Sequence, residues 1–476
     1  MKNNIDLSIK EIHNLLVNKE ITPTTLVNEC FDKIERNDYN AFITLDKEGA
    51  LKRASELEQE EVEVDNLLWG IPIAIKDNIM VKDLKCTCAS KMLENFVSIY
   101  DASVVEEIKN KKMIIIGKTN MDEFAMGSSS ETSYFGAPRN PIDESRVCGG
   151  SSGGSAAAIS GRLVPLSLGS DTGGSIRQPS AFTGIVGMKP TYGRISRYGL
   201  VAFSSSLDQI GPMTKSVEDN AILLNALCKK DLKDLTIFST DEDFTRLIGK
   251  DIKGMRIAVP KYFMSDIVDS KIKDRITKVI TMLENNGAIV SYVDINHIDK
   301  AVTLYQVIAM GEASSNLARF DGVRYGYRYE TDNLEEMYTK TREIGFGKEV
   351  KRRIMVGSYI LSGENAKIYY TKALQIRDDL KKSFEKIFST YDLIIGPTTA
   401  QTAYPLGTNK DNPIKSFMDD ILVMHANMGG FPGMNVPVGT IDKLPVGLQI
   451  LGNQMDEAKM YQLASFIEKK VGDINE

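Results

Sequence analysis

Apolar runs of strand length alternate with amphipathic helical patterns along most of this chain. Strand-type runs occupy residues 41–46, 69–76, 113–120, 255–260, 288–295, 392–399, 434–439 and 446–452. Helical spacing of apolar residues indicates two helices within 8–36 and further helices at 47–61, 102–112, 265–286, 298–318, 348–386 and 456–470. Strands and helices that alternate in this way predict an α/β fold with helices around a central sheet.

The stretch 149–193 carries the most unusual pattern. Two clusters rich in glycine and serine, 149–155 and 172–175, flank an apolar segment that predicts a short buried helix and then a buried strand. Glycine beside serine permits tight turns and exposes N–H groups, which suits the nucleophile and the oxyanion of acyl transfer. A flexible linker and a phosphate-binding loop are the alternatives. The apolar segment disfavours the linker, and the lack of a Gly-Lys-Ser/Thr ending disfavours the phosphate loop.

Composition favours one domain over several. No proline-rich linker, low-complexity segment or repeat divides the 476 residues, so we expect a single domain over 1–476. Within it, residues 1–66 form a mainly helical cover and residues 67–476 the catalytic core. The net charge of −6 gives no overall attraction to nucleic acid or to anionic lipid.

The cysteines, the histidines and the lack of targeting signals indicate where the protein acts and which residue type serves as its base. The five cysteines form no C-x-x-C pair, which predicts reduced buried thiols and no metal site. No signal peptide or membrane span is evident, so we expect a cytoplasmic protein that does not bind membranes. The three histidines are His13, His297 and His425, of which we expect the first two to be solvated and the third to be structural. A lysine is therefore a better candidate base than a histidine.

The segments GGSSGGSAAA and GSDTGGSIRQPSAFTGIVGMKPTYGR resemble the amidase signature family. The resemblance implies a large mixed central β-sheet flanked by helices, with a Ser-Ser-Lys triad that cleaves carboxamides. Carried onto this sequence, Ser175 is the nucleophile, Ser151 the bridging serine and Lys76, in GIPIAIKDN, the base. A lysine accepts a proton only when neutral. The apolar residues IPIAI before Lys76 predict that its side chain is buried, and burial would lower its pKa.

The same resemblance implies further roles around the nucleophile. The backbone N–H groups of Thr172, Gly173 and Gly174, with that of Ser175, are expected to bind the oxyanion. A cis peptide is expected before the bridging serine, at Gly150. Secondary candidates, equally consistent with purely structural use, are Asp171, Ser152 and Arg177, the last as the partner of a nearby carboxylate.

The second half resembles a narrower group, the glutaminase subunits of tRNA-dependent amidotransferases. The resemblance rests on residues 312–328, 346–362 and 419–439, with TCASKML at 87–93 and MGSSSETS at 126–133. It implies that free glutamine is the substrate and that Arg353, Asp420 and Ser128 bind it. The segment HAN at 425–427 departs from the more apolar pattern expected there.

This narrower resemblance also implies partners. Two other subunits, B and C, would complete a heterotrimer in which ammonia from glutamine amidates Glu-tRNA(Gln), Asp-tRNA(Asn) or both. No cofactor is expected in this chain, whereas ATP and Mg²⁺ are expected at the partner subunit, which would also hold most of the mischarged tRNA. A free-standing amidase for other small carboxamides and a non-catalytic scaffold are the alternatives.

A basic and aromatic cluster interrupts the second half. Two uses fit this composition, an RNA contact and a subunit interface, and we favour the interface or a structural role. The cluster comprises Arg319, Arg324, Tyr325, Tyr327, Arg328 and Tyr329.

Overall fold

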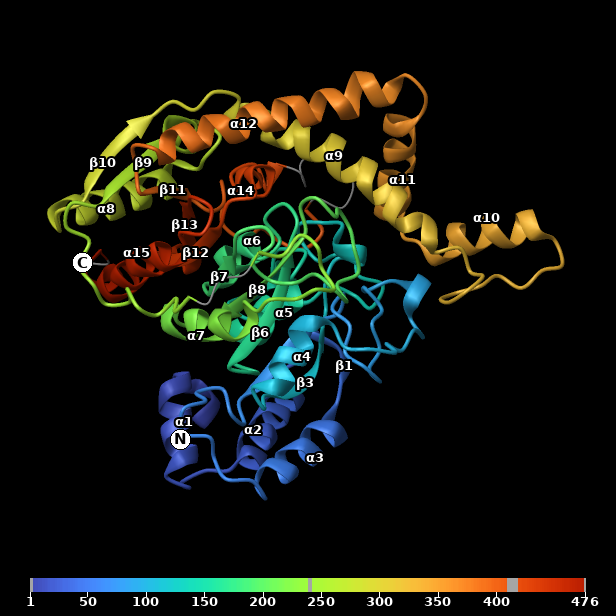
Figure 1. The fold of residues 1–476 in the computed structure, drawn as a ribbon, viewed down its shortest axis with the longest axis horizontal. Helices are drawn as coiled ribbons and strands as arrows, with labels where there is room; N and C mark the ends of the chain where they lie inside the picture. The colour runs from blue at the N-terminus through green and yellow to red at the C-terminus, as the bar shows by residue number, and fades with distance from the viewer. Residues whose placement is uncertain (1–2, 239–241, 409–417, 475–476) are drawn as a thin grey trace.

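The computed structural model describes residues 3–238, 242–408 and 418–474. Within them, eleven strands form one sheet in the order β1-β3-β2-β6-β8-β7-β12-β13-β11-β9-β10 (Figure 1). The strands are β1 Phe42–Leu45, β2 Pro72–Lys76, β3 Ile114–Thr119, β6 Leu166–Asp171, β7 Val186–Lys189, β8 Gln209–Thr214, β9 Arg256–Pro260, β10 Ile289–Val293, β11 Leu393–Pro397, β12 Gly433–Ile441 and β13 Leu444–Gly452. A separate small sheet pairs β4 Arg139–Asn140 with β5 Asp143–Val147.

Parallel and antiparallel pairs are both present in the large sheet. Strands β3, β2 and β6 run parallel at one side, and β11, β9 and β10 run parallel at the other. The strands between them, β8, β7, β12 and β13, pair in antiparallel fashion. The prediction of a large mixed sheet is confirmed, although the sequence analysis did not identify β7 or β8.

Helices surround the sheet, and those at 177–183, 217–227, 334–345 and 424–429 were not predicted from the sequence. They are α1 Ile9–Val17, α2 Pro23–Arg36, α3 Lys47–Leu57, α4 Ser103–Asn110, α5 Gly153–Ser160, α6 Arg177–Thr183, α7 Val217–Leu227, α8 Ser270–Asn285, α9 Ala301–Asn316, α10 Leu334–Gly345, α11 Lys348–Leu361, α12 Lys372–Phe388, α14 Met424–Gly429 and α15 Glu457–Lys470. Helices α5 and α6 pack together against the sheet, and α7 and α15 form another such pair. The blue segment α1–α3 lies beside β2 and β3 (Figure 1).

Local sequence explains several helix boundaries. The Ser8 side chain accepts a hydrogen bond from the Glu11 N–H, and the Glu11 carboxylate accepts one from the Ser8 N–H, which closes a capping box at the start of α1. Thr22 caps α2 in the same way, and Pro23 occupies the first helical position.

The prediction of one helix over 348–386 is wrong. The chain forms two helices, α11 and α12, separated by an extended Ser362, by Gly363 with φ +50° and by the π-helical turn η7, Ala366–Thr371. Glycine adopts this left-handed conformation without a Cβ clash, so Ser362 and Gly363 are a helix-ending signal that the longer apolar periodicity obscured.

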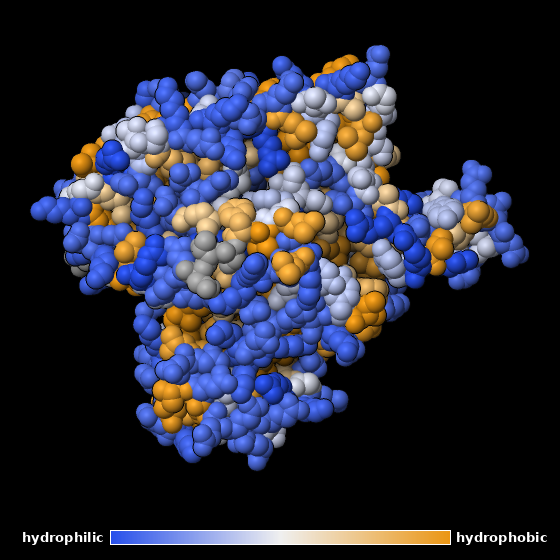
Figure 2. All heavy atoms as spheres, in the orientation of Figure 1, coloured by the Kyte–Doolittle hydropathy of each residue, from blue (hydrophilic) through white to orange (hydrophobic). Residues whose placement is uncertain are grey.

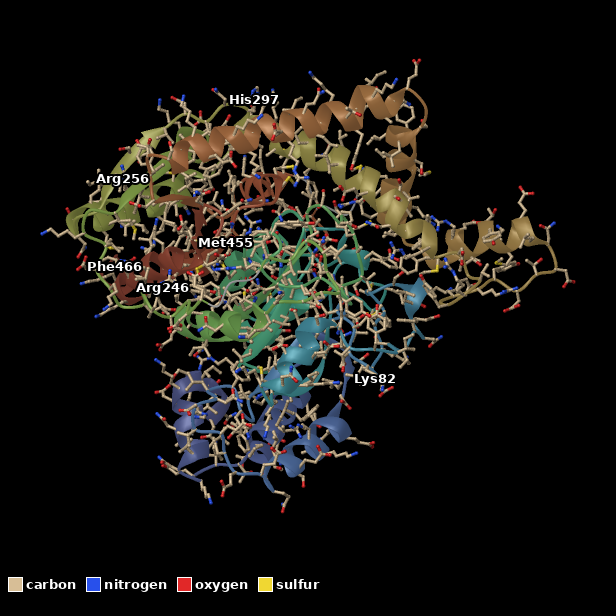
Figure 3. All side chains as sticks on the ribbon, viewed as in Figure 1. Lys82, Arg246, Arg256, His297, Met455 and Phe466 are labelled. Carbon is tan, nitrogen blue, oxygen red and sulfur yellow. The ribbon has the colours of Figure 1, made fainter. Side chains whose placement is uncertain are left out.

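The core runs through the sheet and the helices around it, while charged side chains cover the outside (Figure 3). His297 lies on this exposed surface, as predicted. His13 does not, because its ring is buried with Nε2 at 2.9 Å from the carbonyl oxygen of Val64. The prediction of a solvated His13 is therefore wrong, since the chain after α3 folds back over α1.

Candidate active site

Two parallel strands bring the candidate base and the candidate nucleophile loop to one edge of the sheet. Lys76 is the last residue of β2, and Asp171 is the last residue of β6, which pairs with β2. Carboxyl ends of parallel neighbours lie side by side, so residues 172–175 emerge next to the Lys76 side chain.

The first glycine/serine cluster reaches the same place from α5. Ser151 and Ser152 immediately precede this helix, which packs against β2 and β6. The Gly150–Ser151 peptide is cis, which confirms the prediction. A Cβ on Gly150 would lie 2.1 Å from Asp122 Oδ2 and 2.8 Å from the Ser129 nitrogen, so glycine is required by this close approach.

Lys76 contacts two of the three serines of the first cluster. Its Nζ donates to Ser151 Oγ and to Ser152 Oγ, each at 2.8 Å, and to the Ser170 carbonyl oxygen at 3.3 Å. The side chain is fully buried. The structure thus brings Lys76 and Ser151 into the direct contact that a proton relay requires.

Burial changes the protonation of Lys76. It lowers the pKa from its usual value near 10.5 to about 7, although the carboxylates of Asp122, Asp171 and Asp208 oppose the shift. A lysine with a pKa near 7 is neutral in a large fraction of molecules at neutral pH, and it can therefore accept a proton.

Ser175 lies beside the serines that Lys76 contacts, and it is 6% exposed. Its carbonyl oxygen accepts the Ser152 N–H at 3.2 Å, which ties the two clusters together. Among the described residues, no hydrogen bond joins the hydroxyls of Ser151 and Ser175. In substrate-free active sites such bonds are often long and tighten only when substrate binds.

The N–H groups around the nucleophile differ from the prediction in one respect. Gly174 already donates its N–H to Asp171 Oδ1 at 2.8 Å, so the prediction that it offers a free oxyanion donor is wrong for this structure. The N–H groups of Thr172, Gly173 and Ser175 have no acceptor among the described residues. These three groups are thus the available donors for an oxyanion.

A buried ion pair holds the turn between β6 and α6. Although burial alone would raise the pKa of Asp171, the adjacent Arg177 guanidinium holds that pKa well below its usual range. Arg177 Nε and Nη2 each donate to Asp171 at 3.1 Å, and Asn427 Nδ2 donates at 2.8 Å. The prediction that Arg177 pairs with a nearby carboxylate is confirmed. Asn427, from the unusual HAN segment, completes the network, a role that the sequence analysis missed.

Arg353 points toward this site from α11. It is 5% exposed at the side chain, and its Nε donates to Glu349 Oε1 at 2.7 Å. Its guanidinium carbon lies 5.6 Å from the centre of the Phe203 ring, and Tyr305 also interacts with it. Tyr305 packs over the nucleophile loop, because a Cβ on Gly173 would lie 2.5 Å from its ring. Neither aromatic residue was predicted from the sequence.

Asp420 is buried above the nucleophile loop with an unsatisfied oxygen. Its Oδ1 has no hydrogen-bond partner among the described residues and would lie 3.3 Å from a Cβ on Gly174. Burial raises the pKa of Asp420 well above its usual value, and the charge of Asp419 adds to the effect. A cationic ligand group at Oδ1 would offset this desolvation.

Ser128 lies beside the first cluster, buried at 2% exposure. Its carbonyl oxygen accepts Gln178 Nε2 at 2.9 Å, and Gln178 Oε1 accepts the Gly150 N–H at 2.9 Å. The structure therefore connects Ser128 to the cis peptide through one glutamine side chain.

His425, the cysteines and two tyrosines of the basic and aromatic cluster make contacts within the fold. His425 is buried with its ring nitrogens 2.8 Å and 3.3 Å from the carbonyl oxygens of Ile298 and Leu422, and burial lowers its pKa to about 4. All five cysteines are buried, as predicted. In the basic and aromatic cluster, Tyr325 packs on Phe96 with ring centres 5.8 Å apart, and the Tyr327 N–H donates to the Met92 carbonyl oxygen.

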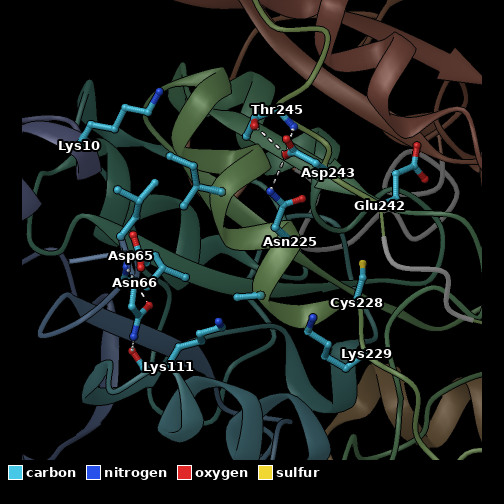
Figure 4. Close-up of a pocket in the computed structure, with 14 residues that line it drawn as sticks. Lys10, Asp65, Asn66, Lys111, Asn225, Cys228, Lys229, Glu242, Asp243 and Thr245 are labelled. Atoms are coloured by element: carbon cyan, nitrogen blue, oxygen red, sulfur yellow. Dashed lines mark hydrogen bonds between the residues drawn. The ribbon is translucent and has the colours of Figure 1, made fainter. Parts of the chain in front are cut away.

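A cavity of about 530 Å³ lies apart from this site (Figure 4). Its lining includes Lys10, Asp65, Lys111, Asn225, Lys229 and Asp243, and none of the candidate site residues. Within the described ranges, no group of three or more His, Cys, Asp or Glu side chains is arranged to hold a metal ion. None of the described helices has the length and apolar character that crossing a bilayer requires.

Known proteins resemble the chain over nearly its whole length. The amidase family model matches residues 25–460. The A subunit of glutamyl-tRNA(Gln) amidotransferase from Pediococcus pentosaceus is 52% identical over 469 residues, covering 97% of this chain and 96% of the relative. The crystal structure of the corresponding A subunit from Thermotoga maritima has a TM-score of 0.83 at 41% identity, over 98% of this chain and 96% of the other. Peptide amidase of Stenotrophomonas maltophilia has a TM-score of 0.82 at 27% identity, over 98% and 97%. The chain therefore belongs to the amidase family and, within it, to the glutamyl-tRNA(Gln) amidotransferase A subunits.

Proposed function

We propose that this chain is the glutamine-hydrolysing subunit of a tRNA-dependent amidotransferase and that Lys76, Ser151 and Ser175 are its catalytic triad. The observation that carries the proposal is the fully buried Lys76 Nζ, 2.8 Å from Ser151 Oγ at the edge where the Ser175 loop emerges. Base catalysis without a histidine needs a desolvated lysine whose amino group is hydrogen-bonded to a serine hydroxyl.

The chemistry follows from these positions. Neutral Lys76 takes a proton through Ser151 from Ser175, whose Oγ attacks the carboxamide carbon. The N–H groups of Thr172, Gly173 and Ser175 stabilise the oxyanion. The same proton then passes to the amide nitrogen as the C–N bond breaks, so ammonia leaves and a glutamyl ester remains on Ser175. A water molecule, deprotonated by the same relay, hydrolyses the ester to glutamate.

Recognition of glutamine uses both ends of its zwitterion. Arg353 supplies a planar guanidinium for the α-carboxylate, because such a fork binds carboxylates bidentately. Asp420 supplies a carboxylate for the α-ammonium, and its unsatisfied Oδ1 supports this role. Ser128 is the third proposed contact. Together they favour glutamine over amides that lack these charges.

Partner subunits carry the rest of the reaction in this proposal. The B and C subunits would complete a heterotrimer, and ATP with Mg²⁺ would activate the carboxylate of Glu-tRNA(Gln) or Asp-tRNA(Asn) on the partner. Ammonia must travel by a protected route, since most of it is protonated in water at pH 7. We also propose a cytoplasmic location and one domain over residues 1–476.

The first test separates ammonia production from ammonia use. Ser175→Ala is expected to lower glutaminase activity by about a thousandfold or more, and Lys76→Ala or Ser151→Ala by orders of magnitude. With the partner subunits present, added ammonium should restore ATP-dependent amidation of the tRNA in Ser175→Ala. Glutamine hydrolysis at the wild-type rate in this variant would refute the triad.

The second test addresses specificity. Arg353→Ala should raise KM for glutamine about tenfold to a hundredfold, yet leave hydrolysis of γ-aminobutyramide, which lacks the α-carboxylate, unchanged. Asp420→Asn should likewise raise KM for glutamine, yet leave hydrolysis of glutaramate, which lacks the ammonium group, unchanged. Equal losses toward all three amides would mean that these residues support the fold instead. Brisk hydrolysis of all three by the wild type would favour the free-standing amidase.

A further inference from the structure

A loop that contains three serines contacts both the nucleophile loop and the proposed glutamine-binding Arg353. The serine loop, residues 203–208, is anchored at its inner end by the fully buried Asp208 side chain. Asp208 Oδ2 accepts the N–H groups of Phe203 and Ser204 at 2.9 Å and 3.0 Å, and Oδ1 accepts Thr172 Oγ1 at 2.7 Å. The serine loop is thereby joined to the nucleophile loop.

One carboxylate from α9 anchors the outer end. Glu312 Oε2 accepts Ser204 Oγ at 2.7 Å and the Ser206 N–H at 2.9 Å, while Oε1 accepts the Tyr370 hydroxyl at 3.2 Å. Within the part of the chain that the structure describes, Glu312 forms no salt bridge. Its charge strengthens these three hydrogen bonds relative to bonds to a neutral acceptor. The charge also acts on the nearby guanidinium of Arg377, which donates to Ser206 Oγ and to the Ser206 carbonyl oxygen at 3.1 Å each.

The position of the serine loop sets the surroundings of Arg353. The loop begins with Phe203, whose ring lies 5.6 Å from the Arg353 guanidinium carbon and 6.5 Å from the centre of the Tyr305 ring. A cation above an aromatic face is attracted to it, and that attraction depends on the placement of the ring. A shift of Ser204 would move Phe203 and thus the guanidinium.

We infer that Glu312 is a positioning residue for glutamine recognition, acting through the serine loop and Phe203 on Arg353; this inference rests on the proposed function. Glu312 lies in the segment 312–328, which distinguishes this chain from the general amidase pattern. Glu312 is bonded to neither Arg353 nor the nucleophile loop, so its effect on glutamine binding passes through the serine loop.

The test measures steady-state kinetics of the full chain together with its co-purified partner subunits. Glu312→Gln keeps the shape but removes the charge, and should raise KM for glutamine about tenfold with kcat within about twofold. Kinetics with γ-aminobutyramide should stay at the wild-type level, because this amide has no carboxylate for Arg353. The surface pair Lys340–Glu343 supplies the control, since Glu343→Gln should change neither parameter.

A double-mutant cycle distinguishes an effect of Glu312 on Arg353 from a general effect of Glu312 on the fold. If Glu312 acts through Arg353, the KM of Glu312→Gln combined with Arg353→Lys should barely exceed that of Arg353→Lys alone. Ser204→Ala removes a single hydroxyl and should raise KM for glutamine about threefold, so it decides the matter even if Glu312→Gln does not fold.

Two results would overturn the inference. One is a wild-type KM for glutamine in Ser204→Ala and Glu312→Gln, and the other is an equal loss toward glutamine and γ-aminobutyramide. Both presuppose a wild-type enzyme that hydrolyses glutamine. A wild type that does not would instead refute the proposed function itself, so the two failures are distinguishable.

Discussion

Lys76 and Lys189 show that burial alone does not define a catalytic lysine. Both side chains are buried, and in both burial lowers the pKa to about 7. Lys76 Nζ faces two serine hydroxyls, whereas Lys189 Nζ donates to the Pro190 carbonyl oxygen at 2.9 Å. A carbonyl accepts but has no proton to give, so of these two lysines only Lys76 is placed to take one.

This difference predicts a pH profile. Because Lys76 acts as a base only when neutral, kcat/KM for glutamine should rise with pH, with a midpoint near the pKa of about 7, and level off above it. Lys189→Met removes the other buried lysine at similar volume and should keep this midpoint. The profile is measured by ammonia release between mildly acidic and mildly alkaline pH. If the rise of kcat/KM with pH disappeared in Lys189→Met, the titrating group would be Lys189 and the assignment to Lys76 would be wrong.

The turn between β6 and α6 is the element that decides the geometry of the nucleophile. Gly174 has φ +123°, and a Cβ there would lie 2.2 Å from Val423 Cγ2. Neither the backbone conformation nor the packing accepts a side chain, since L-residues rarely adopt such a φ. The position of the turn therefore depends on the contact with Val423 and on the hydrogen bond from the Gly174 N–H to Asp171.

Gly174→Ala is consequently expected to lower glutaminase activity by more than about a hundredfold, because small displacements of a nucleophile are costly. Gly363→Ala is the matched control, since Gly363 also has a positive φ, +50°, but open space where the Cβ would lie. It should lower stability by roughly 1 kcal/mol and leave kcat unchanged. Thermal unfolding and steady-state kinetics on both variants measure these effects, and an active Gly174→Ala enzyme would contradict the argument.

At the scale of the whole molecule, the outer face of α11 stands out. Met355 and Tyr359 are exposed on it, and the Tyr359 ring lies 6.1 Å from that of Tyr369 on η7. Apolar atoms gather where α11 meets α12 (Figure 2). The opposite side of the same helix carries Arg353, so a partner subunit on this face would lie next to the glutamine site. Exposed apolar patches of this kind often mark subunit contacts.

Replacing both Met355 and Tyr359 by Asp should therefore weaken co-purification of the partner subunits, because charge is costly in an apolar interface. Glutamine hydrolysis by the chain itself should remain, as neither side chain points into the site. Size-exclusion chromatography of the co-expressed subunits gives the result. Replacing Leu232 and Leu235, exposed apolar residues elsewhere on the chain, by Asp is the control. Undiminished assembly of the α11 variant would place the interface on another face.

The amino-acid sequence by itself determined the features that depend on neighbouring residues. The apolar run before Lys76 makes a strand, the glycines around Ser151 and Ser175 make tight turns, and Thr22 with Pro23 starts a helix, because each follows from local backbone preferences. Tertiary structure decided the rest. The lowered pKa of Lys76 required burial, Asn427 came to donate a hydrogen bond to Asp171, and Asp420 came to lie over the nucleophile loop with an oxygen unsatisfied. These contacts join segments up to hundreds of residues apart, and no local pattern records which distant groups will share a desolvated space.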